Sequence, residues 1–450
     1  MMKELLLVVT IGGWLGGNPG ERSVVGDTEI TKWQYGKKGA VSITYDDGSS
    51  DQFSRALPIM RRLKLPATFF VITGPIAGSN YQAKFIGRPV KEIISESANI
   101  PTNADNFFER ASAARYLGYQ GTIAYYDRAD ARFESGKKEM AYTIMDSLYS
   151  VVRSGSLEPG ETLSNEVMQE KGLIWDSLKQ YAAEGYEPAS HTVTHAHLAV
   201  LDTANMLYEL QKSKEDILEH LGAEYTFSAE VPYGIEDPRV MKYGLPVYLT
   251  LRNSMPEPFM KEINRGYRDQ PGAFADKEYV QWQRGPITRT TMEQMYSWVD
   301  TTLAHTNIWL VLVFHGVDDI GWEPLTHERL DTYFQFIKQR DDRLWIATFG
   351  DVAKYLRERM DAKVQSALKG KEIVINLSHS LDPTVYKLPL TLKTYVPAGW
   401  KNVRVMQGDK IQQVASEKDE KGTFLLYQAR PNAEEVKLSQ GNAEYLKSKK

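Results

Sequence analysis

The sequence of 450 residues contains no cysteine. Disulfide bonds, thiolate metal ligands and cysteine nucleophiles are therefore excluded, although the compartment stays open. Any metal ion must be bound by His, Asp or Glu side chains.

The chain also lacks a marked excess of either charge. Its formal net charge is −4, and no cluster of Lys and Arg is interleaved with aromatic residues. A basic surface is the usual footprint of a nucleic-acid-binding protein. We therefore expect no nucleic acid among its partners.

Long apolar runs are missing as well. No run approaches the roughly 18 residues that cross a bilayer, so we expect no membrane span. The N-terminus, MMKELLLVVTIGGWLGG, has one Lys before an apolar run from Leu5 to Ile11 and then small residues. This pattern predicts a signal peptide at residues 1–17 and a secreted or periplasmic protein. The alternative is a buried N-terminal strand in a cytoplasmic protein.

From Ala40 to about Arg359 the sequence repeats one pattern: a short β-rich run, a polar or Gly/Pro tip, and an amphipathic helical stretch. Alternating strands and helices predict an α/β fold with a parallel sheet, and seven such runs predict a barrel. In such barrels the functional residues lie at the C-terminal ends of the strands. The predicted strands are Val41–Tyr45, Thr68–Thr73, Tyr186–Ser190, Tyr225–Val231, Val247–Arg252, Trp309–Phe314 and Leu344–Phe349.

We expect the catalytic domain at residues 18–364. Two regions depart from its pattern, one inside this domain and one after it. Residues 75–165 form a long polar insertion, which we interpret as a lid or a substrate-shaping wall; a structural flap or a dimer contact is the alternative. At residues 365–450 the sequence alternates, as in EIVINLS and VYKLPLTLKTYVP. This alternation predicts a small β-sandwich-like domain that either binds glycan or caps the barrel.

Chemically capable residues follow four of the predicted strands. A lone His at a strand end is more often a packing residue, but four strand ends must meet on one face of a barrel. Three of the eight histidines lie at two of these ends. The four tips are Asp46-Asp47, the SHTVTH segment with His191 and His195, Pro232-Tyr233-Gly234, and His315-Gly316.

These residues predict a catalytic metal site. His191 and His195 are four residues apart, so on one helical turn both rings can face a single cation. One carboxylate completes a three-residue set with open positions, and the other is free to take a proton from water that the metal activates. We assign Asp47 to the metal and Asp46 to the base, with a His on the opposite wall as the acid. The alternative for the Asp pair is a helix N-cap and turn.

The motifs TYDDG, SHTVTHAHL, VPYG and LVFHG, in this order, resemble those of the NodB-homology polysaccharide deacetylases. This carbohydrate esterase family removes acetyl groups from chitin, peptidoglycan and xylan. The resemblance covers about residues 38–360 apart from the insertion. It implies a distorted (β/α)7 barrel that binds zinc or a similar divalent ion; Co²⁺, Ni²⁺ and Mn²⁺ also suit such ligands. The implied roles are Asp47, His191 and His195 as metal ligands, Asp46 as base, His315 as acid, and the backbone N–H of Tyr233 as an oxyanion donor.

The chain departs from the family pattern in two places. The family has an Arg three residues before the Tyr of its Pro-Tyr-Gly motif, where this chain has Glu230. A nearby Glu would raise the pKa of Asp46, so we expect Glu230 to point elsewhere or another cation to compensate. Arg252 is our hypothesis for that cation, with an ordinary surface Arg as the alternative. The Asp-rich motif that orients the catalytic His is not recognisable, and Asp269 and Asp276 are the candidates.

Further residues receive weaker assignments. We assign Pro232 and Tyr233 to substrate binding, and Trp322 to stacking on a sugar ring, with loop packing as the alternative. His197 is predicted to lie in a second layer or at the surface. His305, His327 and His379 show no partner pattern.

Together these features predict a metal-dependent enzyme that removes N- or O-acetyl groups from a glycan. A hydrolase of a non-glycan amide is the first alternative, because the insertion and Glu230 set this chain apart from the family. A carbohydrate-binding protein with a degenerate site is the second. Against it, the full set of acid, base and metal-binding residues is present.

Overall fold

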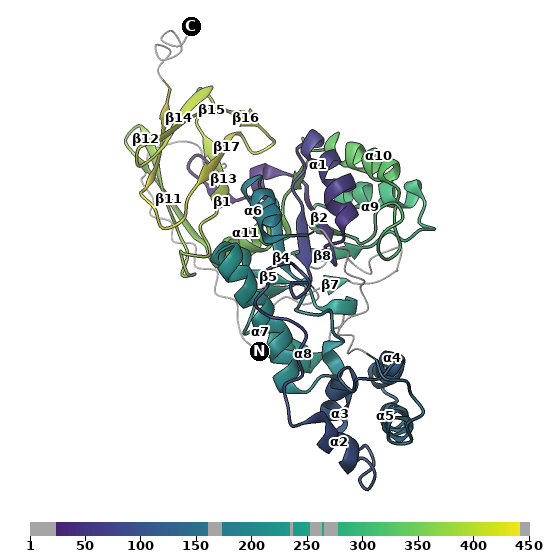
Figure 1. The fold of residues 1–450 in the computed structure, drawn as a ribbon. Helices are drawn as coiled ribbons and strands as arrows, with labels where there is room; N and C mark the ends of the chain where they lie inside the picture. Colours follow the sequence, from purple (N-terminus) through teal and green to yellow (C-terminus); the bar gives the residue numbers. More distant parts are fainter. Residues whose placement is uncertain (1–23, 161–172, 235–236, 253–262, 265–277, 442–450) are drawn as a thin grey trace.

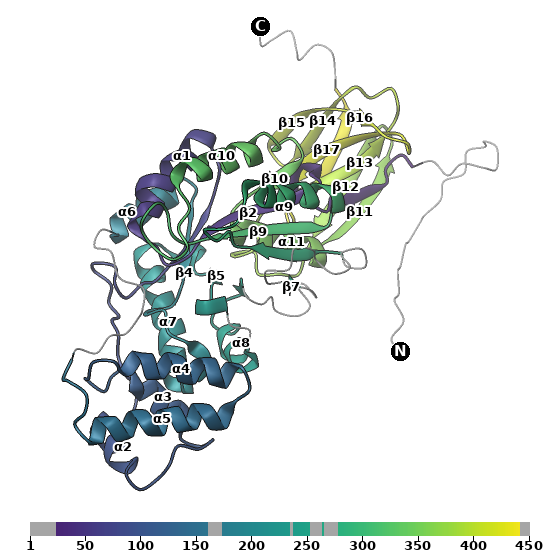
Figure 2. The same cartoon turned by 90° about the vertical axis from the view of Figure 1, so that its right-hand side faces the viewer.

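The computed structural model describes residues 24–160, 173–234, 237–252, 263–264 and 278–441. Figure 1 shows three parts: a parallel sheet surrounded by helices, a helical extension at the lower end, and antiparallel strands at the upper left. The same parts are seen after a quarter turn in Figure 2.

The central sheet is parallel in all its pairings and contains nine of the described strands, in the order β6-β5-β4-β3-β2-β9-β8-β7, with β10 beside β2. β2 and β9 are buried throughout and read GAVSITY and IWLVLVF. Near-continuous apolar runs of this kind are typical of parallel strands that helices cover on both faces. The strands are β2 (Gly39–Tyr45), β3 (Thr68–Val71), β4 (Glu187–Ser190), β5 (Ser228–Ala229), β6 (Thr250–Leu251), β7 (Ile263–Asn264), β8 (Val280–Arg284), β9 (Ile308–Phe314) and β10 (Leu344–Ile346).

The predicted α/β class and distorted barrel are confirmed, and each of the seven predicted runs overlaps a strand of this sheet. β7 and β8 were not predicted. β8 reads VQWQR, and all five of its residues are buried. The two glutamines interrupt the apolar run by which a buried strand is predicted.

Helices follow most of the strands, and side chains cap the first turns of several of them. Asp202, Thr326 and Thr348 accept hydrogen bonds from the first turns of α7, α10 and α11, and Thr291 with Gln294 forms a capping box on α9. The helices are α1 (Leu57–Leu63), α6 (Trp175–Ala183), α7 (Thr203–His220), α8 (Pro238–Gly244), α9 (Met292–His305), α10 (His327–Lys338) and α11 (Phe349–Asp361).

The predicted insertion contains four helices: α2 (Val90–Glu96), α3 (Phe107–Ala114), α4 (Thr122–Glu134) and α5 (Lys138–Arg153). α4 and α5 lie side by side at the lower end of Figure 2. Their apolar side chains share one core with residues of the barrel, including Leu198 and Val231. The insertion is therefore packed against the barrel through a hydrophobic core.

The C-terminal region forms two antiparallel sheets, ordered β1-β13-β17-β16 and β11-β12-β18-β14-β15. β1 (Thr28–Ile30) comes from the N-terminal part of the chain and pairs with β13. Trp400 and Leu425 share a core with Tyr355 of α11, which joins these sheets to the barrel. The other strands are β11 (Lys363–Lys369), β12 (Glu372–Ser378), β13 (Leu390–Val396), β14 (Asn402–Gln407), β15 (Lys410–Ala415), β16 (Glu417–Lys418), β17 (Thr423–Ala429) and β18 (Val436–Gln440).

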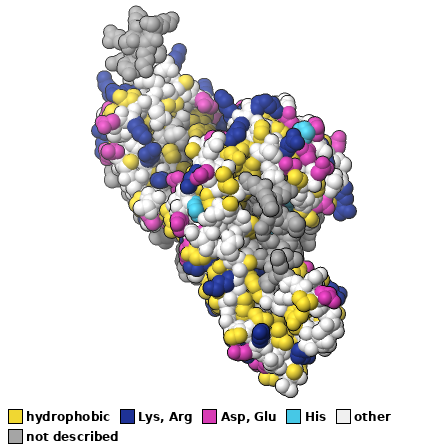
Figure 3. All heavy atoms as spheres, in the orientation of Figure 1, with side chains coloured by type: hydrophobic (Ala, Val, Ile, Leu, Met, Phe, Trp, Pro, Cys, Tyr) yellow, Lys and Arg dark blue, Asp and Glu magenta, His cyan; other side chains and the backbone are white. Residues whose placement is uncertain are grey.

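The surface in Figure 3 shows Lys and Arg interspersed with Asp and Glu, and yellow hydrophobic side chains gathered at the lower end. None of the helices in the described part of the chain combines the length and apolarity needed to cross a membrane.

Candidate active site

Five polar residues each occupy the first position after a strand of the parallel sheet. Because parallel strands present their C-terminal ends at one edge, these residues gather in one place. They are Asp46 after β2, His191 after β4, Glu230 after β5, Arg252 after β6 and His315 after β9.

Asp47, His191 and His195 form a compact cluster of potential metal ligands. Asp47 Oδ1 lies 3.5 Å from His191 Nε2 and 3.4 Å from His195 Nε2. One ligand atom from each of the three residues lies within 4.8 Å of the others. The other ring nitrogens face protein atoms: His191 Nδ1 lies 3.0 Å from the carbonyl oxygen of Glu230, and His195 Nδ1 lies 3.2 Å from the hydroxyl of Tyr233. Such contacts fix the ring orientation and leave both Nε2 atoms directed toward Asp47.

The chain between the two histidines differs from the helical turn that we predicted. It forms a tight turn in which Thr192 and His195 have positive φ angles of 69° and 59°. The backbone N–H of His195 donates to the hydroxyl of Thr192 at 3.0 Å. The rings therefore meet through left-handed backbone positions, not through helical periodicity.

Arg252 binds the carboxylate of Asp46 through two hydrogen bonds. Arg252 Nη1 and Nη2 donate to the two carboxylate oxygens at 2.7 and 2.6 Å. The same Nη2 lies 2.9 Å from Glu230 Oε1, so Glu230 shares this cation with Asp46. His315 Nε2 lies 3.5 Å from Asp46 Oδ2. The structure thus places Arg252 where we expected a compensating cation.

The electrostatics of the cluster favour charged carboxylates. Burial raises the pKa of Asp46, but Arg252, His315 and His191 outweigh this effect and hold the pKa below its ordinary value. Burial also raises the pKa of Asp47, yet the hydrogen bond with His191 and the nearby histidines bring it well below the usual range.

The pKa values of the two histidines are shifted in opposite directions. Burial, followed by the charge of His191, lowers the pKa of His195 to about 3. For His191, burial lowers the pKa but the hydrogen bond with Asp47 and the nearby carboxylates raise it overall. A neutral His195 is in the form that binds a metal ion.

The cluster fits a divalent cation. The carboxylates of Asp46, Asp47 and Glu230 are buried, and among the described residues Arg252 is the guanidinium that contacts two of them. Asp47 with the Nε2 atoms of His191 and His195 gives one carboxylate and two imidazoles, which is a usual catalytic zinc set.

The remaining predicted residues lie around this cluster. Tyr233, in the short turn η5 (Pro232–Gly234), has a φ of 62° and is 43% exposed, whereas Pro232 is buried. Trp322 is 53% exposed, and its ring meets that of His315 edge to face at 4.8 Å. His197 is buried and stacks on Tyr233. Asp269 and Asp276 lie outside the described residues.

Several supporting residues escaped the sequence analysis. Gln52, in the π-helical turn η2 (Gln52–Ala56), donates to the carbonyl oxygens of both Asp46 and His315 and so ties two strand ends together. Gln281 and Gln283 of β8 donate to the carbonyl oxygen of Arg252 at 2.9 and 2.7 Å. No local motif marks these glutamines, because their partners are distant in sequence.

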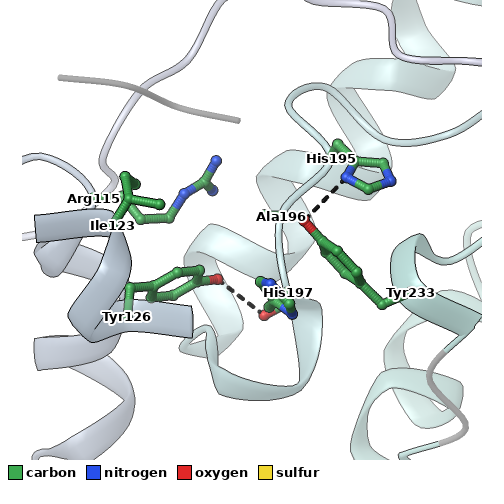
Figure 4. A pocket seen from close by; sticks show the side chains of 7 residues that line it. All are labelled: Arg115, Ile123, Tyr126, His195, Ala196, His197 and Tyr233. Atoms are coloured by element: carbon green, nitrogen blue, oxygen red, sulfur yellow. Dashed lines mark hydrogen bonds between the residues drawn. The ribbon is translucent and has the colours of Figure 1, made fainter. Parts of the chain in front are cut away.

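A small pocket adjoins the metal-ligand cluster on the side of the insertion. Figure 4 shows Arg115 and Tyr126 of the insertion facing His195, His197 and Tyr233 across it. The insertion therefore contributes side chains directly beside a potential metal ligand.

Comparison with known proteins points to one class of enzyme. The polysaccharide deacetylase family model matches residues 34–101 and 151–245. The resemblance seen in the motifs is thereby confirmed, and polysaccharide deacetylase is the enzyme class that the match supports. Asp46, Asp47, His191 and His195 lie inside the matched segments, whereas Arg252 and His315 follow them. Residues 102–150, which lie between the segments, include α3, α4 and most of α5.

Individual proteins resemble the chain more distantly. A gellan lyase from a Bacillus species is 25% identical over 297 residues, which cover 59% of this chain and 11% of that protein's length. A putative polysaccharide deacetylase from Mycobacterium smegmatis shares 13% identity, with 74% of this chain and 94% of that chain covered and a TM-score of 0.36. Agd3, described as a novel carbohydrate deacetylase, shares 10% identity over 90% of this chain and 65% of that chain, with a TM-score of 0.38.

Proposed function

We propose that this protein is a metal-dependent carbohydrate deacetylase. The observation that carries the proposal is the convergence of Asp47, His191 and His195 on one point, beside an Asp46 that contacts both Arg252 and His315. Zinc is the metal we propose, with Co²⁺, Ni²⁺ and Mn²⁺ as ions that the same ligands accept.

Asp47 Oδ1 and the Nε2 atoms of His191 and His195 would hold the ion. A divalent ion at this position supplies Lewis-acid polarisation of the acetyl carbonyl and lowers the pKa of water. Asp46 is the base that takes a proton from the attacking water, because its carboxylate stays ionised and lies next to the cluster. His315 Nε2, 3.5 Å from Asp46, donates a proton to the leaving group. The backbone N–H of Tyr233 is the proposed donor to the oxyanion.

Arg252 acts as a positioning residue for the base. Its two hydrogen bonds fix the plane of the Asp46 carboxylate and stabilise its charge. Glu230 steadies the guanidinium through Nη2 and, through its carbonyl oxygen, the ring of His191. Glu230 therefore connects the base to the metal ligands.

The proposed substrate is an acetylated glycan. Two exposed aromatic rings border the row of catalytic residues, Trp322 next to His315 and Tyr233 next to His195. Exposed aromatic faces of this kind pack well against sugar rings. We also propose that the protein is exported, on the pattern of residues 1–17; N-terminal sequencing of the secreted protein tests this.

Acetate release is the direct test of the proposed function. The protein, loaded with zinc or cobalt, is incubated with chitooligosaccharides, peptidoglycan fragments and acetylated xylan beside an Asp46→Asn variant that keeps the metal ligands. Release by the wild type that falls by a factor of about 10² to 10⁴ in the variant supports the proposal.

The same panel separates the alternatives. Metal-loaded protein that releases no acetate from any glycan but hydrolyses simple amides would point to a hydrolase of a non-glycan amide. Glycan binding without any hydrolysis, measured by calorimetry, would point to a carbohydrate-binding protein.

A further inference from the structure

The helices of the insertion touch the segment that carries the second histidine of the metal-ligand cluster. α3, α4 and most of α5 fall between the two segments that the family model matches, so these contacts are features of this chain that the match does not cover. Ala196, Leu198 and Val200, just beyond His195, pack in one core with Phe107, Met145 and Tyr149 of the insertion.

Helix α4 holds His197 through three residues. Asp130 Oδ2 lies 2.8 Å from His197 Nδ1, and Asp127 Oδ1 lies 3.8 Å from Nε2. The hydroxyl of Tyr126 donates to the backbone carbonyl of His197 at 3.2 Å, as Figure 4 shows. Both the ring and the backbone of His197 are therefore set by the insertion.

His197 in turn sets the ring of Tyr233. The two rings are parallel, with an interplanar angle of 1° and centroids 3.6 Å apart. Tyr233 has a left-handed backbone conformation, with φ of 62°, which is costly for a residue with a side chain and persists where neighbouring contacts hold it. The stacked His197 is such a contact.

Tyr233 completes the connection to the metal ligand. Its hydroxyl lies 3.2 Å from His195 Nδ1, on the side of the imidazole away from Asp47. When Nε2 faces a metal ion, Nδ1 carries the proton and donates to this hydroxyl. The hydroxyl thus fixes the tautomer and the tilt of the ligand ring.

A second contact from the insertion holds Thr194, the residue before His195. Arg115, at the end of α3, donates through Nη2 to the hydroxyl of Thr194 at 3.0 Å, and its Nη1 lies 3.8 Å from Glu209. Glu209 also accepts from the backbone N–H and the hydroxyl of Thr194. The insertion therefore contacts the residue before His195 and the residue two positions after it.

We propose that Asp130 is a positioning residue that acts through His197 and Tyr233 to orient His195 for metal binding. On this inference the insertion orients a ligand of the metal site, in addition to any contact that it makes with the substrate. The inference rests on the proposed metal site, and it predicts that the affinity for zinc depends on side chains of α4.

The test compares zinc affinity in three variants by competition with a chromophoric chelator. Tyr233→Phe keeps the stacked ring but removes the hydroxyl, and Asp130→Ala removes the partner of His197. Loss of a group that supports a metal ligand typically weakens binding by about 10-fold to 100-fold. We expect about 10-fold weaker binding in Tyr233→Phe and a loss of at least about threefold in Asp130→Ala.

Asp146→Ala is the matched control on the same insertion. Asp146 accepts from the backbone and hydroxyl of Thr102 within the insertion, away from His197, so its removal loosens the insertion without touching the proposed connection. We expect a lower Tm but unchanged zinc affinity.

Three outcomes overturn the inference: zinc affinity at the wild-type level in Tyr233→Phe, the same in Asp130→Ala, or an equal loss in Asp146→Ala. A wild-type protein that binds no zinc, cobalt, nickel or manganese would instead overturn the proposed metal site. The absorption spectrum of the cobalt-loaded variants gives a second readout, because a reoriented His195 changes the ligand field even where binding persists.

Discussion

Arg252 forms a two-point hydrogen bond with Asp46, although the two residues follow strands that are four places apart in the sheet, β6 and β2. The resemblance to the deacetylases led us to expect an Arg at the position of Glu230, which follows β5. In this chain Arg252 follows the next strand, β6, and its guanidinium contacts both Asp46 and Glu230. Arg252 therefore supplies the positive charge beside Asp46, the proposed base.

Replacing Arg252 should shift the pH dependence of activity. In Arg252→Gln the cation that lowers the pKa of Asp46 is gone, while burial continues to raise it. The base then stays protonated to a higher pH, so the acidic limb of the kcat/KM profile should move up by about 1–3 units. The measurement is a profile of kcat/KM against pH for wild type and variant.

This variant also breaks the buried ion pair between Arg252 and Asp46, so it should lose about 3–5 kcal/mol of stability. The control is the double variant Arg252→Gln with Glu230→Gln, which also removes the buried charge of Glu230; it should recover part of the lost stability and, because a negative charge near Asp46 is gone, move the acidic limb partway back. An unshifted acidic limb in Arg252→Gln would show that Arg252 has no influence on the base.

The two neighbouring aspartates should separate metal binding from proton transfer. Asp46→Asn should retain one zinc ion per chain but lower kcat by a factor of about 10² to 10⁴, since the base is lost. Asp47→Asn should lose stoichiometric zinc, because Asp47 Oδ1 is the carboxylate oxygen that faces both Nε2 atoms. Metal content by mass spectrometry and kcat give the two readouts. Loss of zinc in Asp46→Asn with retention in Asp47→Asn would reverse the assignment.

Trp322 should contribute to glycan binding. Its exposed ring lies against His315, so Trp322→Ala should raise KM by about threefold to tenfold with a smaller change in kcat. Trp322→Phe keeps an aromatic face and serves as the control. An unchanged KM on an acetylated oligosaccharide would leave Trp322 as a loop-packing residue.

Glu358 should make stability depend on pH. Its side chain is fully buried 3.5 Å from His379, and burial raises its pKa from 4.5 to about 7, while a hydrogen bond from the backbone of Leu388 and the charge of Lys354 oppose this. The folded protein binds this proton more tightly than the unfolded chain. The contribution to stability is therefore full below about pH 4.5 and is lost as pH rises through 7, by up to about 3 kcal/mol.

Glu358→Gln, which cannot ionise, should flatten this part of the profile. The measurement is Tm between pH 4.5 and 8 for both proteins. Parallel Tm profiles would contradict the prediction.

The sequence predicted the residues that follow strands, because a parallel barrel brings strand ends together whatever lies between them. Asp46, His191, His315 and Arg252 were found in this way, and the structure places them in one cluster. The conformation of the His191–His195 turn was not foreseen, since positive φ angles at Thr192 and His195 depend on contacts such as the hydroxyl bond of Thr192.

Contacts between residues that are distant in the sequence could not be predicted from the sequence. The hydroxyl of Tyr233 and the Asp130–His197 contact depend on how the insertion packs, and nothing near His197 indicates that α4 lies against it. β8 was missed for a related reason: its glutamines are buried because they hydrogen-bond to the carbonyl oxygen of Arg252, so the strand lacks an apolar pattern.

The pairing of β1 with β13 has a consequence for how the chain can fold during synthesis. Residues 28–30 leave the ribosome before the barrel, yet their partners at residues 392–394 emerge after it. β1 therefore cannot pair with β13 until residues 392–394 have been made. The barrel can form in the meantime, and the four-stranded sheet that contains β1 and β13 is completed afterwards.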